Sequence, residues 1–439
     1  MIVVGRIHAS RSATVACLLS DLDCFYNILL DCVNANPILW AWRANRLLPR
    51  AWTIIFCSLL QNPTTVKNLI SRLILGVLFV LGLAYSASHA SAQEAPDRVI
   101  LFIIDGLSPQ APERIEMPHY NALKEKGVLY KEMHLPLPGH PDKGPDYPWS
   151  CSLPNPMLMS GTPFVGIDGI RESMIQHSFD PKETAFIVNA RSYLDVSGGF
   201  GTYVSKSRNP DSLVIDITTK TMKEQDFAFM RVHLQRPGIE GMKVSWEKYS
   251  DQPYYRNIWH EESRYRNALE IADEQLGRFV DWLKAEELWD GTVLMICGDH
   301  GQADEGWHEP YSPAANKTPL LIVGAGVSVP RTFGYCEIFD IAPTISHLAK
   351  RKKPAFSCGR ILHEAFDENV DAPKVAKSVQ RLNEVLIKAH ALPDAQKKLL
   401  SEEGFMTLDD LGKWHTTEAG ADFDQFALQQ EALLNSVPK

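Results

Sequence analysis

The nine-residue run RVILFIIDG at 98–106 constrains the fold of this chain more than any other feature. Its β-branched and aliphatic residues continue without a break to Asp105, whereas a strand with one face in water would alternate with polar residues. Comparable apolar runs lie at 184–190, 226–234, 291–301 and 318–326. These runs predict strands buried on both faces, which requires a central sheet covered by helices.

Two segments between these strands have the spacing of helices. The first lies within 117–130, and its helix is predicted to end at Gly127, because glycine commonly ends a helix. The second, 265–288, repeats apolar residues about every 3.6 positions, namely Ala268, Ile271, Ala272, Leu276, Phe279, Val280 and Leu283. A strand, a helix and a second strand in succession favour a right-handed crossover between parallel strands. The predicted fold class is α/β with a mostly parallel sheet.

The N-terminal region has the pattern of an export signal. Lys67 and Arg72 precede the apolar run at 73–85, and the sequence ASA at 90–92 is a small-residue cleavage site. Because a spanning helix needs about 20 apolar residues and this run is shorter, a cleaved signal peptide is preferred; an uncleaved membrane anchor is the alternative. We expect an exported protein, periplasmic or extracellular.

The predicted domain boundaries follow from this signal and from composition. Residues 1–65 do not fit a signal peptide. One explanation is that translation starts at Val66, and the alternative is a genuine cytoplasmic or membrane-associated prefix. From about Asp367 the chain becomes charged and helical without a catalytic motif. The expected organisation is a prefix over 1–65, a signal peptide over 66–92, a catalytic domain over 93–366 and a helical C-terminal extension over 367–439.

Charge and cysteine content narrow the classes of function. The formal net charge of -9 provides no basic field for a phosphate backbone, so nucleic acid is not an expected partner. Four of the eight cysteines lie in the prefix, and the remaining four are too few for a disulfide scaffold in so long a chain. One bridge between Cys336 and Cys358 stays open, as does the oligomeric state.

Two predicted strands end in residue types that bind metals. Asp105 ends the first strand, and Asp299 and His300 follow the strand within 291–301. Functional groups collect at the carboxyl ends of strands in such sheets, so these side chains can converge. Two carboxylates and an imidazole suit a single divalent cation. Either aspartate alone would also suit a helix cap or a turn, but the combination favours a metal site.

The order of these motifs resembles the alkaline phosphatase superfamily, in its branch of sulfatases and type I phosphodiesterases or nucleotide pyrophosphatases. The resemblance is carried by LFIIDG at 101–106, DHG at 299–301, TPLLIVGAG at 318–326 and DIAPTISHLA at 340–349. It implies a three-layer α/β sandwich with one or two metals at the carboxyl edge of a mostly parallel sheet. It also implies a covalent intermediate on Ser, Thr or a cysteine-derived formylglycine.

The nucleophile position of this superfamily falls on Cys151 and Ser152. The segment SLPN at 152–155 is similar to the phosphodiesterase pattern of Thr, apolar, Pro and Asn. The sulfatase pattern also selects Ser152, although Pro156 stands where its arginine is expected, and only the spacing to the later Ser-Gly pair favours Cys151. The resemblance therefore implies Ser152 as nucleophile and Asn155 as a ligand of a substrate oxygen. An ordinary turn is the alternative role for Asn155.

The resemblance weakens at the position of a second metal. Two-metal phosphodiesterases carry an Asp and, four residues later, a His after the strand at 226–234, where this chain has Gly238 and Met242. We expect that site to be lost or rebuilt, with Glu240 or His233 as substitute ligands, although a Glu in a polar loop is usually just solvated. His308 lies where relatives place a metal- or substrate-binding residue, and it is also a ligand candidate.

These inferences predict an exported, metal-dependent hydrolase that cleaves small-molecule phosphate esters through Ser152. Zinc suits the ligand set of two Asp and one His, and calcium or manganese suits a more oxygen-rich site. Gly106 stands where sulfatases usually carry a second Asp, which favours phosphate esters; a sulfatase is the near alternative. A catalytically silent ligand-binding protein that keeps the fold is the alternative from another class.

Overall fold

The chain divides into two units, 1–92 and 93–439. A computed structural model describes parts of the second unit, namely residues 95–137, 153–308, 311–374, 377–406 and 422–437. The predicted prefix and signal peptide, and the nucleophile candidates Cys151 and Ser152, lie outside the described residues. No helix among the residues that are described is long and apolar enough to cross a membrane.

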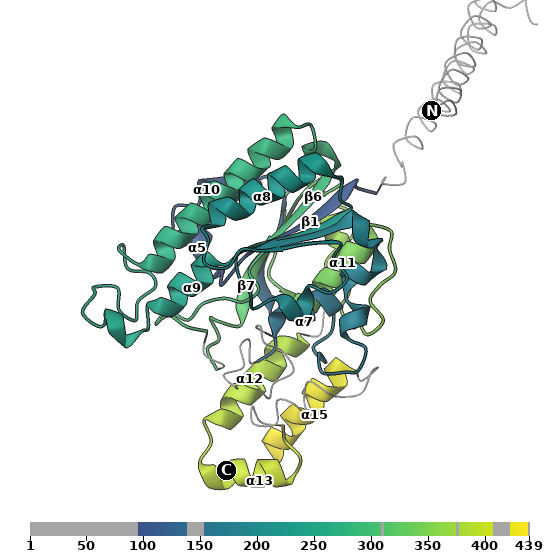
Figure 1. The fold of residues 1–439 in the computed structure, drawn as a ribbon. Helices are drawn as coiled ribbons and strands as arrows, with labels where there is room; N and C mark the ends of the chain where they lie inside the picture. Colours follow the sequence, from purple (N-terminus) through teal and green to yellow (C-terminus); the bar gives the residue numbers. More distant parts are fainter. Residues whose placement is uncertain (1–94, 138–152, 309–310, 375–376, 407–421, 438–439) are drawn as a thin grey trace, which may run out of the picture. The chain divides into compact units, whose positions relative to one another are not determined.

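A nine-stranded mixed sheet forms the centre of the second unit, in the order β4-β3-β5-β1-β6-β7-β2-β8 with β9 paired to β2 (Figure 1). The strands are β1 (Arg98–Ile104), β2 (Val128–His134), β3 (Thr184–Val188), β4 (Thr202–Ser205), β5 (Phe229–Leu234), β6 (Thr292–Cys297), β7 (Lys317–Gly324), β8 (Arg331–Phe333) and β9 (Cys336–Glu337). From β4 to β6 every neighbouring pair is parallel. The predicted mostly parallel α/β sheet is confirmed.

Strand β7 is antiparallel to both of its neighbours, β6 and β2. A parallel connection needs a crossover, usually a helix, to carry the chain back to the starting edge. The described residues between β6 and β7 form turns and no helix. The chain therefore turns back directly, and β7 enters the sheet from the edge at which β6 ends.

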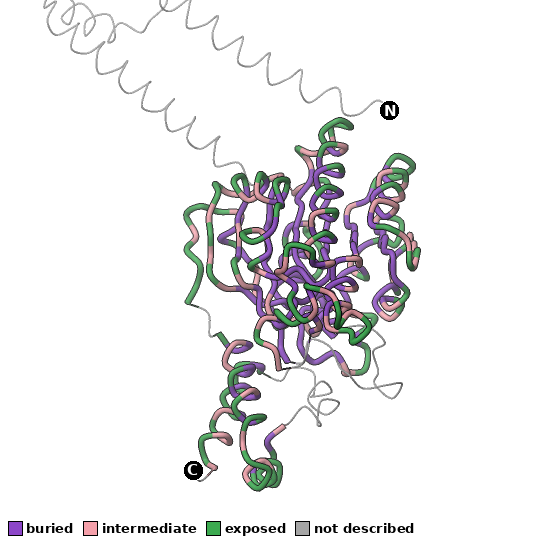
Figure 2. Tube along the Cα trace, turned by 90° about the vertical axis from the view of Figure 1, so that its left-hand side faces the viewer, coloured by how far each residue is buried: buried purple, intermediate pink, exposed green. Residues whose placement is uncertain are grey.

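Side chains of the central strands alternate between two apolar layers. In β1 the odd-numbered residues from Val99 to Ile103 belong to one hydrophobic cluster, and the even-numbered residues from Ile100 to Ile104 belong to the other. All six are 0% exposed. Complete burial of an aliphatic or Phe side chain stabilises a fold by about 1.5–3 kcal/mol, so both layers hold the sheet in place. Figure 2 shows the buried residues through the centre of this unit.

Helices cover both faces of the sheet, as the three-layer prediction requires. On one face lie α7 (Pro154–Ser160) and α11 (Ile341–Leu348); α12 (Ser378–His390) and α15 (Phe423–Ser436) belong to the same hydrophobic cluster and extend away from the sheet in Figure 1. On the other lie α5 (Ala111–Arg114), α6 (Pro118–Lys124), α8 (Asp211–Glu224) and α10 (Arg264–Ala285). The short helices α9 (Arg236–Lys243) and α13 (Asp394–Glu402) complete the described set.

Helix α10 is the helix predicted over 265–288. The Ser263 side chain accepts a hydrogen bond from the Tyr265 N–H and caps its N-terminus. The predicted apolar stripe packs against the sheet, with one exception. Ile271 is 40% exposed, because it lies at the rim of the stripe and away from the strands.

The C-terminal extension packs against the α/β unit. Val379 and Leu382 of α12 and Phe426 of α15 belong to the same hydrophobic cluster as β1. Asn383 joins α12 to the segment after β2, since its Oδ1 accepts from the Leu137 N–H at 2.9 Å and its Nδ2 donates to the Leu135 carbonyl at 2.8 Å. These contacts attach α12 and α15 to the α/β unit.

The bridge considered between Cys336 and Cys358 does not form, because both cysteines are free thiols in the structure. Cys336 is buried and Cys358 is exposed. Cys297 is also a buried free thiol. The described part of the unit is therefore held together by packing and hydrogen bonds, without a disulfide between these residues.

Candidate metal centre

Three neighbouring strands bring acidic and imidazole groups together at one edge of the sheet. Asp105 follows β1, Asp299 follows β6, and His233 lies near the end of β5, which pairs with β1 on the opposite side from β6. One ligand atom from each of these three residues lies within 4.8 Å of the other two. All three side chains are buried, with exposed fractions of 3%, 0% and 0%. The predicted convergence of Asp105 with Asp299 is present.

One oxygen of Asp105 is held by three donors. Its Oδ2 accepts from the Tyr193 hydroxyl at 2.5 Å, from His233 Nε2 at 3.1 Å and from Gln235 Nε2 at 3.1 Å. Burial, followed by the charge of Asp105, raises the pKa of Tyr193 well above its usual value, so this hydroxyl keeps its proton and donates it. The other oxygen, Oδ1, lies 3.6 Å from His300 Nε2.

Asp299 is fixed by backbone and side-chain donors. Its Oδ1 accepts from the Gly106 N–H at 3.3 Å and from the His300 N–H at 3.1 Å. Its Oδ2 accepts from Asn155 Nδ2 at 2.9 Å. The Asn155 Oδ1 in turn accepts from Arg231 Nη2. The predicted substrate-oxygen ligand Asn155 thus lies in the site, fully buried, with its amide bonded to a ligand carboxylate.

A backbone carbonyl fixes the tautomer of His300, which was predicted as a metal ligand. Its Nδ1 lies 2.7 Å from the Gly301 carbonyl oxygen, which can only accept, so Nδ1 carries the proton. The lone pair of Nε2 then points toward Asp105 Oδ1 at 3.6 Å and Asp299 Oδ1 at 3.8 Å. A backbone carbonyl that fixes the tautomer of a ligating His in this way is common in metal sites.

The electrostatics around His300 favour a positive charge. Burial acts to lower the pKa of His300, but the charges of Asp299 and Asp105 and the hydrogen bond to Gly301 raise it overall. Two buried carboxylates beside the imidazole therefore favour a cation at this place. A divalent cation with oxygen and nitrogen ligands suits this place, and the donor set of the site fits one.

His233 has a different tautomer. Its Nδ1 lies 3.3 Å from Arg231 Nη2, and a guanidinium has no acceptor, so Nδ1 accepts and Nε2 donates to Asp105. Burial, together with the charges of Arg231 and His300, lowers the pKa of His233 to about 3, which keeps the imidazole neutral. In this tautomer His233 orients the Asp105 carboxylate. Binding a cation through Nε2 would require the proton to move to Nδ1, against the guanidinium.

Gly238 leaves no room for a metal ligand at the position where two-metal phosphodiesterases carry an Asp. A Cβ at this position would lie 1.7 Å from Asp105 Oδ1 and 2.7 Å from Asp105 Cγ. An acidic side chain at 238 therefore cannot coexist with Asp105 in its present place. Glu240, considered as a substitute, is paired with Arg236 at 2.8 Å, Lys243 at 2.9 Å and Arg264 at 2.6 Å, and it is not in the group with Asp105.

His308 lies beside the candidate centre. Its ring packs edge-on against that of His300, with centroids 4.6 Å apart, and its exposed fraction is 8%. This contact restricts how far the His300 ring can rotate. The structure thus places His308 next to a ligand candidate, where it supports the orientation of that imidazole.

Three residues of the site did not emerge from the sequence, namely Tyr193, Arg231 and Gln235. Arg231 had a detectable signal, because it is a charged residue inside an otherwise apolar strand. It is 0% exposed, and its guanidinium carbon lies 4.6 Å from the centroid of the Phe186 ring. Tyr193 and Gln235 come from loops after β3 and β5, and nothing in their local pattern separates them from ordinary loop residues.

The fold and this site define a sulfatase-like α/β protein with candidate metal ligands at the carboxyl edge of its sheet. The family model described as Sulfatase matches residues 215–351, a range that includes His233, Asp299 and His300. The resemblance to the alkaline phosphatase superfamily is therefore confirmed. Members of this superfamily are mostly hydrolytic enzymes of phosphate and sulfate esters, and they typically depend on divalent metals.

Two curated relatives differ in the chemistry that their names state. Choline-sulfatase of Rhizobium meliloti (strain 1021) is 24% identical over 119 residues, covering 26% of this chain and 23% of that protein. GPI ethanolamine phosphate transferase 1 of Yarrowia lipolytica (strain CLIB 122 / E 150) is 26% identical over 250 residues, covering 50% of this chain and 25% of that protein. The match thus spans about a quarter of the length of either relative.

Among solved structures, the phosphonate monoester hydrolase from Silicibacter pomeroyi is similar to this chain with a TM-score of 0.46. It is 14% identical, and the match covers 64% of this chain and 78% of that one. A protein in the alkaline phosphatase superfamily from Vibrio parahaemolyticus has a TM-score of 0.44 and 18% identity, with 65% and 72% of the two chains covered.

Proposed function

We propose that this protein hydrolyses small-molecule phosphate esters at a single divalent cation held by Asp105, Asp299 and His300. The observation that carries the proposal is the meeting of two buried carboxylates and an oriented imidazole, with ligand-atom distances of 3.6 and 3.8 Å. Zinc is the proposed cation, because a set of two Asp and one His suits it. When bound, the cation would lower the pKa of a nucleophile and neutralise charge on the transferred group.

Ser152 is the proposed nucleophile. Asn155, three residues further along the chain, is bonded through its side chain to Asp299 Oδ2 at 2.9 Å. Asn155 is the last residue of the segment SLPN at 152–155, which is similar to the phosphodiesterase pattern, so the described end of this segment lies at the candidate metal centre. This agreement between the pattern and the position of Asn155 supports Ser152 as the nucleophile.

The proposed reaction has two balanced steps. The Ser152 oxygen attacks phosphorus in line, a Ser–O–P bond forms, the ester P–O bond breaks, and the alcohol leaves with a proton. Water then attacks the same phosphorus, the Ser–O–P bond breaks, and phosphate leaves while the hydroxyl regains its proton. The residues of this chain orient the reacting groups: His233 and Tyr193 hold Asp105, and Asn155 holds Asp299.

Gly106 supports phosphate over sulfate esters. Its φ of +67° lies in the left-handed region, and a Cβ at this position would lie 3.1 Å from both Gln302 Oε1 and the Gly238 Cα. The second Asp that is usual in sulfatases would therefore be strained and crowded here. With position 238 also closed, the site offers fewer oxygen ligands than a calcium-binding sulfatase centre needs.

Two other reactions are alternatives to the hydrolysis of phosphate esters, and a comparison with known proteins favours each of them. The Sulfatase family model and choline-sulfatase favour sulfate esters. The GPI ethanolamine phosphate transferase favours transfer of a phosphoryl group to an acceptor other than water. A silent binding protein is favoured by none of them. Export to the periplasm or the exterior is proposed from the N-terminal pattern alone.

Activity assays with metal analysis test the proposal. The purified protein is assayed with p-nitrophenyl phosphate, bis-p-nitrophenyl phosphate and p-nitrophenyl sulfate, as wild type, Ser152→Ala and Asp105→Asn, with Cys151→Ala as the matched control. We expect phosphate-ester turnover that falls by at least about 1,000-fold in Ser152→Ala and persists in Cys151→Ala. Turnover of the sulfate ester alone, or turnover unchanged in Ser152→Ala, would overturn the proposal.

A further inference from the structure

A cavity of about 340 Å³ lies next to the candidate metal centre. Residues that follow β3, β4 and β5 line it, namely Asn189, Ser207 and Gln235 among others. These three strands and β1 are parallel, so the cavity lies at the same edge of the sheet as Asp105. Its volume lies toward the lower end of the range for small-molecule pockets, about 300–1,000 Å³, and suits one compact substituent.

Four cations line the cavity: Arg191, Arg208, Arg236 and Lys243. Among the described residues that line it, none is acidic. Arg236 and Lys243 share one carboxylate, Glu240, at 2.8 and 2.9 Å. Arg191 and Arg208 form no ion pair with any residue that the structure describes. The wall therefore carries an excess of positive charge.

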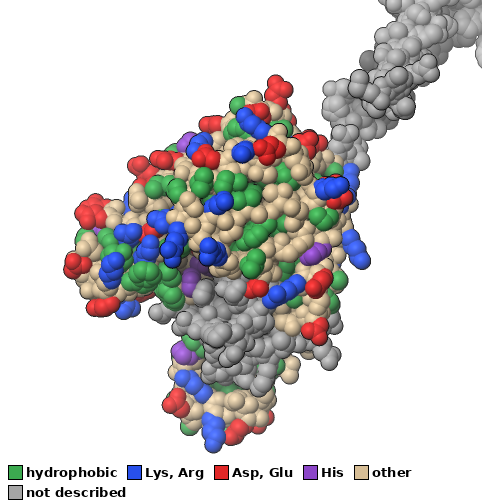
Figure 3. Space-filling view, in the orientation of Figure 1, with side chains coloured by type: hydrophobic (Ala, Val, Ile, Leu, Met, Phe, Trp, Pro, Cys, Tyr) green, Lys and Arg blue, Asp and Glu red, His purple; other side chains and the backbone are tan. Residues whose placement is uncertain are grey.

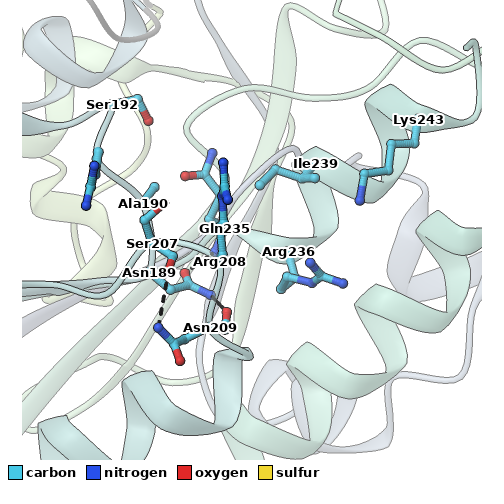
Figure 4. A pocket seen from close by; sticks show the side chains of 11 residues that line it. Asn189, Ala190, Ser192, Ser207, Arg208, Asn209, Gln235, Arg236, Ile239 and Lys243 are labelled. Carbon is cyan, nitrogen blue, oxygen red and sulfur yellow. Dashed lines mark hydrogen bonds between the residues drawn. The ribbon is translucent and has the colours of Figure 1, made fainter.

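The arrangement in Figure 4 brings these groups to one space. Arg236 and Lys243 extend from α9 on one side, Ser192 lies on the other, and Gln235 and Arg208 lie between them. Figure 3 shows Lys and Arg side chains gathered on the face of the molecule that carries α9. The polar neighbours Asn189 and Asn209 provide amide groups in the same lining. Such a lining is complementary to an anion and poorly suited to an apolar ligand.

The backbone at Arg208 supports a specific role for its side chain. Arg208 has a φ of +67°, in the left-handed region that non-glycine residues other than Asn and Asp rarely adopt. Such strain is commonly kept where a side chain must be placed for binding. Here the strained residue is one of the two arginines that no described acidic group neutralises.

A hydrogen-bonded wall joins the cavity to the metal centre. Gln235 lines the cavity, and its Nε2 donates to Asp105 Oδ2 at 3.1 Å and to the Tyr193 hydroxyl at 3.2 Å. The Gln235 N–H donates to Asn189 Oδ1 at 3.0 Å, and Asn189 Nδ2 donates to Asp211 Oδ1 at 2.7 Å. Asp211, 1% exposed, thus lies behind the wall and faces the Asn189 amide. One side chain separates the cavity from a proposed metal ligand.

We infer that this cavity binds a second anionic group of the substrate, a phosphate, sulfate or carboxylate on the part of the ester that leaves. The inference rests on the proposed function, since it takes the cleaved ester to lie at the candidate metal centre. The substrate class is then an ester that carries two anions, one of which is transferred and one of which is held by Arg191 and Arg208. These two arginines determine specificity without contacting the reacting atoms.

Paired substrates test the inference. Steady-state kinetics compare p-nitrophenyl phosphate, which has one anion, with glucose 1,6-bisphosphate, which has two, for wild type and for the double variant Arg191→Gln/Arg208→Asn. Asn is chosen at 208 because it tolerates the left-handed backbone. Lys220→Gln on α8, whose side chain is 76% exposed, is the control for loss of a positive charge. We expect kcat/KM for the bisphosphate to fall at least about tenfold in the double variant alone, with p-nitrophenyl phosphate unchanged.

A binding measurement separates failure of this inference from failure of the proposed function. Calorimetric titration of the metal-loaded protein with inorganic phosphate, at constant ionic strength, requires no turnover. Absence of hydrolysis of both esters would contradict the proposed function. The anion site would still be supported if the double variant binds phosphate at least about tenfold more weakly than wild type and Lys220→Gln. Equal phosphate affinity in all three proteins, or equal kinetic losses on both substrates, would overturn the inference.

Discussion

Gly238 of α9 lies directly against the carboxylate of Asp105, so close that a Cβ on Gly238 would be 1.7 Å from Oδ1. The contact explains why position 238 carries no acidic ligand: the space that its side chain would need is filled by the Asp105 carboxylate. An acidic residue at 238 would need Asp105 to move, and Asp105 is held in place by three donors on Oδ2. The glycine at 238 is therefore needed for Asp105 to keep its present position.

Gly238→Ala tests this contact. The added methyl group must displace the Asp105 carboxylate, because the helix backbone around 238 is packed against it. We expect metal affinity to fall about 10- to 100-fold, measured by competition with a chromophoric chelator. Gly334→Ala, at a position with nothing within 4 Å of the added Cβ, controls for the general effect of a glycine replacement. Equal affinity in Gly238→Ala and wild type would refute the close contact.

Asn155 positions Asp299, since its Nδ2 donates to Oδ2 at 2.9 Å. Asn155→Ala removes this bond and also removes one of the acceptors of the buried Arg231 Nη2, which keeps His233 Nδ1 at 3.3 Å. We expect metal affinity to fall about tenfold or more and kcat with it, while KM changes less. A rise in KM with unchanged metal affinity would instead favour the substrate-oxygen role predicted from the sequence.

Removal of the metal should lower thermal stability through the same residues. At free zinc of about 1,000 times Kd, binding to the folded state alone adds about 4 kcal/mol to the free energy of unfolding. We expect EDTA to lower Tm in wild type and zinc to restore it, with no zinc-dependent shift in Asp299→Asn. An equal zinc-dependent shift in that variant would place the tightest site elsewhere.

Asp211 predicts a pH dependence of stability. Burial raises its pKa to about 6, because only one of its two oxygens accepts hydrogen bonds, from Asn189 Nδ2 and the Arg236 N–H. The unfolded chain releases this proton near the ordinary value of 3.8, so the folded state binds more protons between these pKa values. Stability is therefore lost as the pH rises through this window.

Asp211→Asn removes that loss. The difference of about two pKa units corresponds to roughly 3 kcal/mol, which we expect the variant to gain relative to wild type at pH 7.5 and not at pH 4. Urea unfolding at both pH values measures it. Asp216→Asn, on the same helix with a 61% exposed side chain, is the control. A gain of the same size at both pH values would show that the effect is not the titration of Asp211.

The sequence predicted the parts of the site that follow directly from strand ends. Asp105, Asp299 and His300 each come after an uninterrupted apolar run, and parallel strands must bring such ends to one edge. The strands β1, β3, β5, β6 and β7 were predictable for the same reason, since burial on both faces favours a mostly apolar run, although β5 contains Arg231 and His233. The antiparallel direction of β7 could not be predicted from the sequence, because an apolar run looks the same for a parallel and for an antiparallel strand.

The residues that hold these ligands could not be derived in this way. Tyr193 and Gln235 reach Asp105 from loops after β3 and β5, and their contact depends on the strand order β3-β5-β1, which is a tertiary property. The tautomer of His233 depends likewise on Arg231 two residues earlier on the same strand. The cavity beside Gln235 combines side chains from three separate segments, and no local pattern links them.

The central claim is that Asp105, Asp299 and His300 share one cation. Anomalous diffraction at the zinc edge, on crystals of the zinc-loaded protein, tests it most directly. We predict one strong peak at about 2.0–2.2 Å from a carboxylate oxygen of each aspartate and from His300 Nε2. A peak bound by other residues, or no peak between the two aspartates at saturating zinc, would contradict the account.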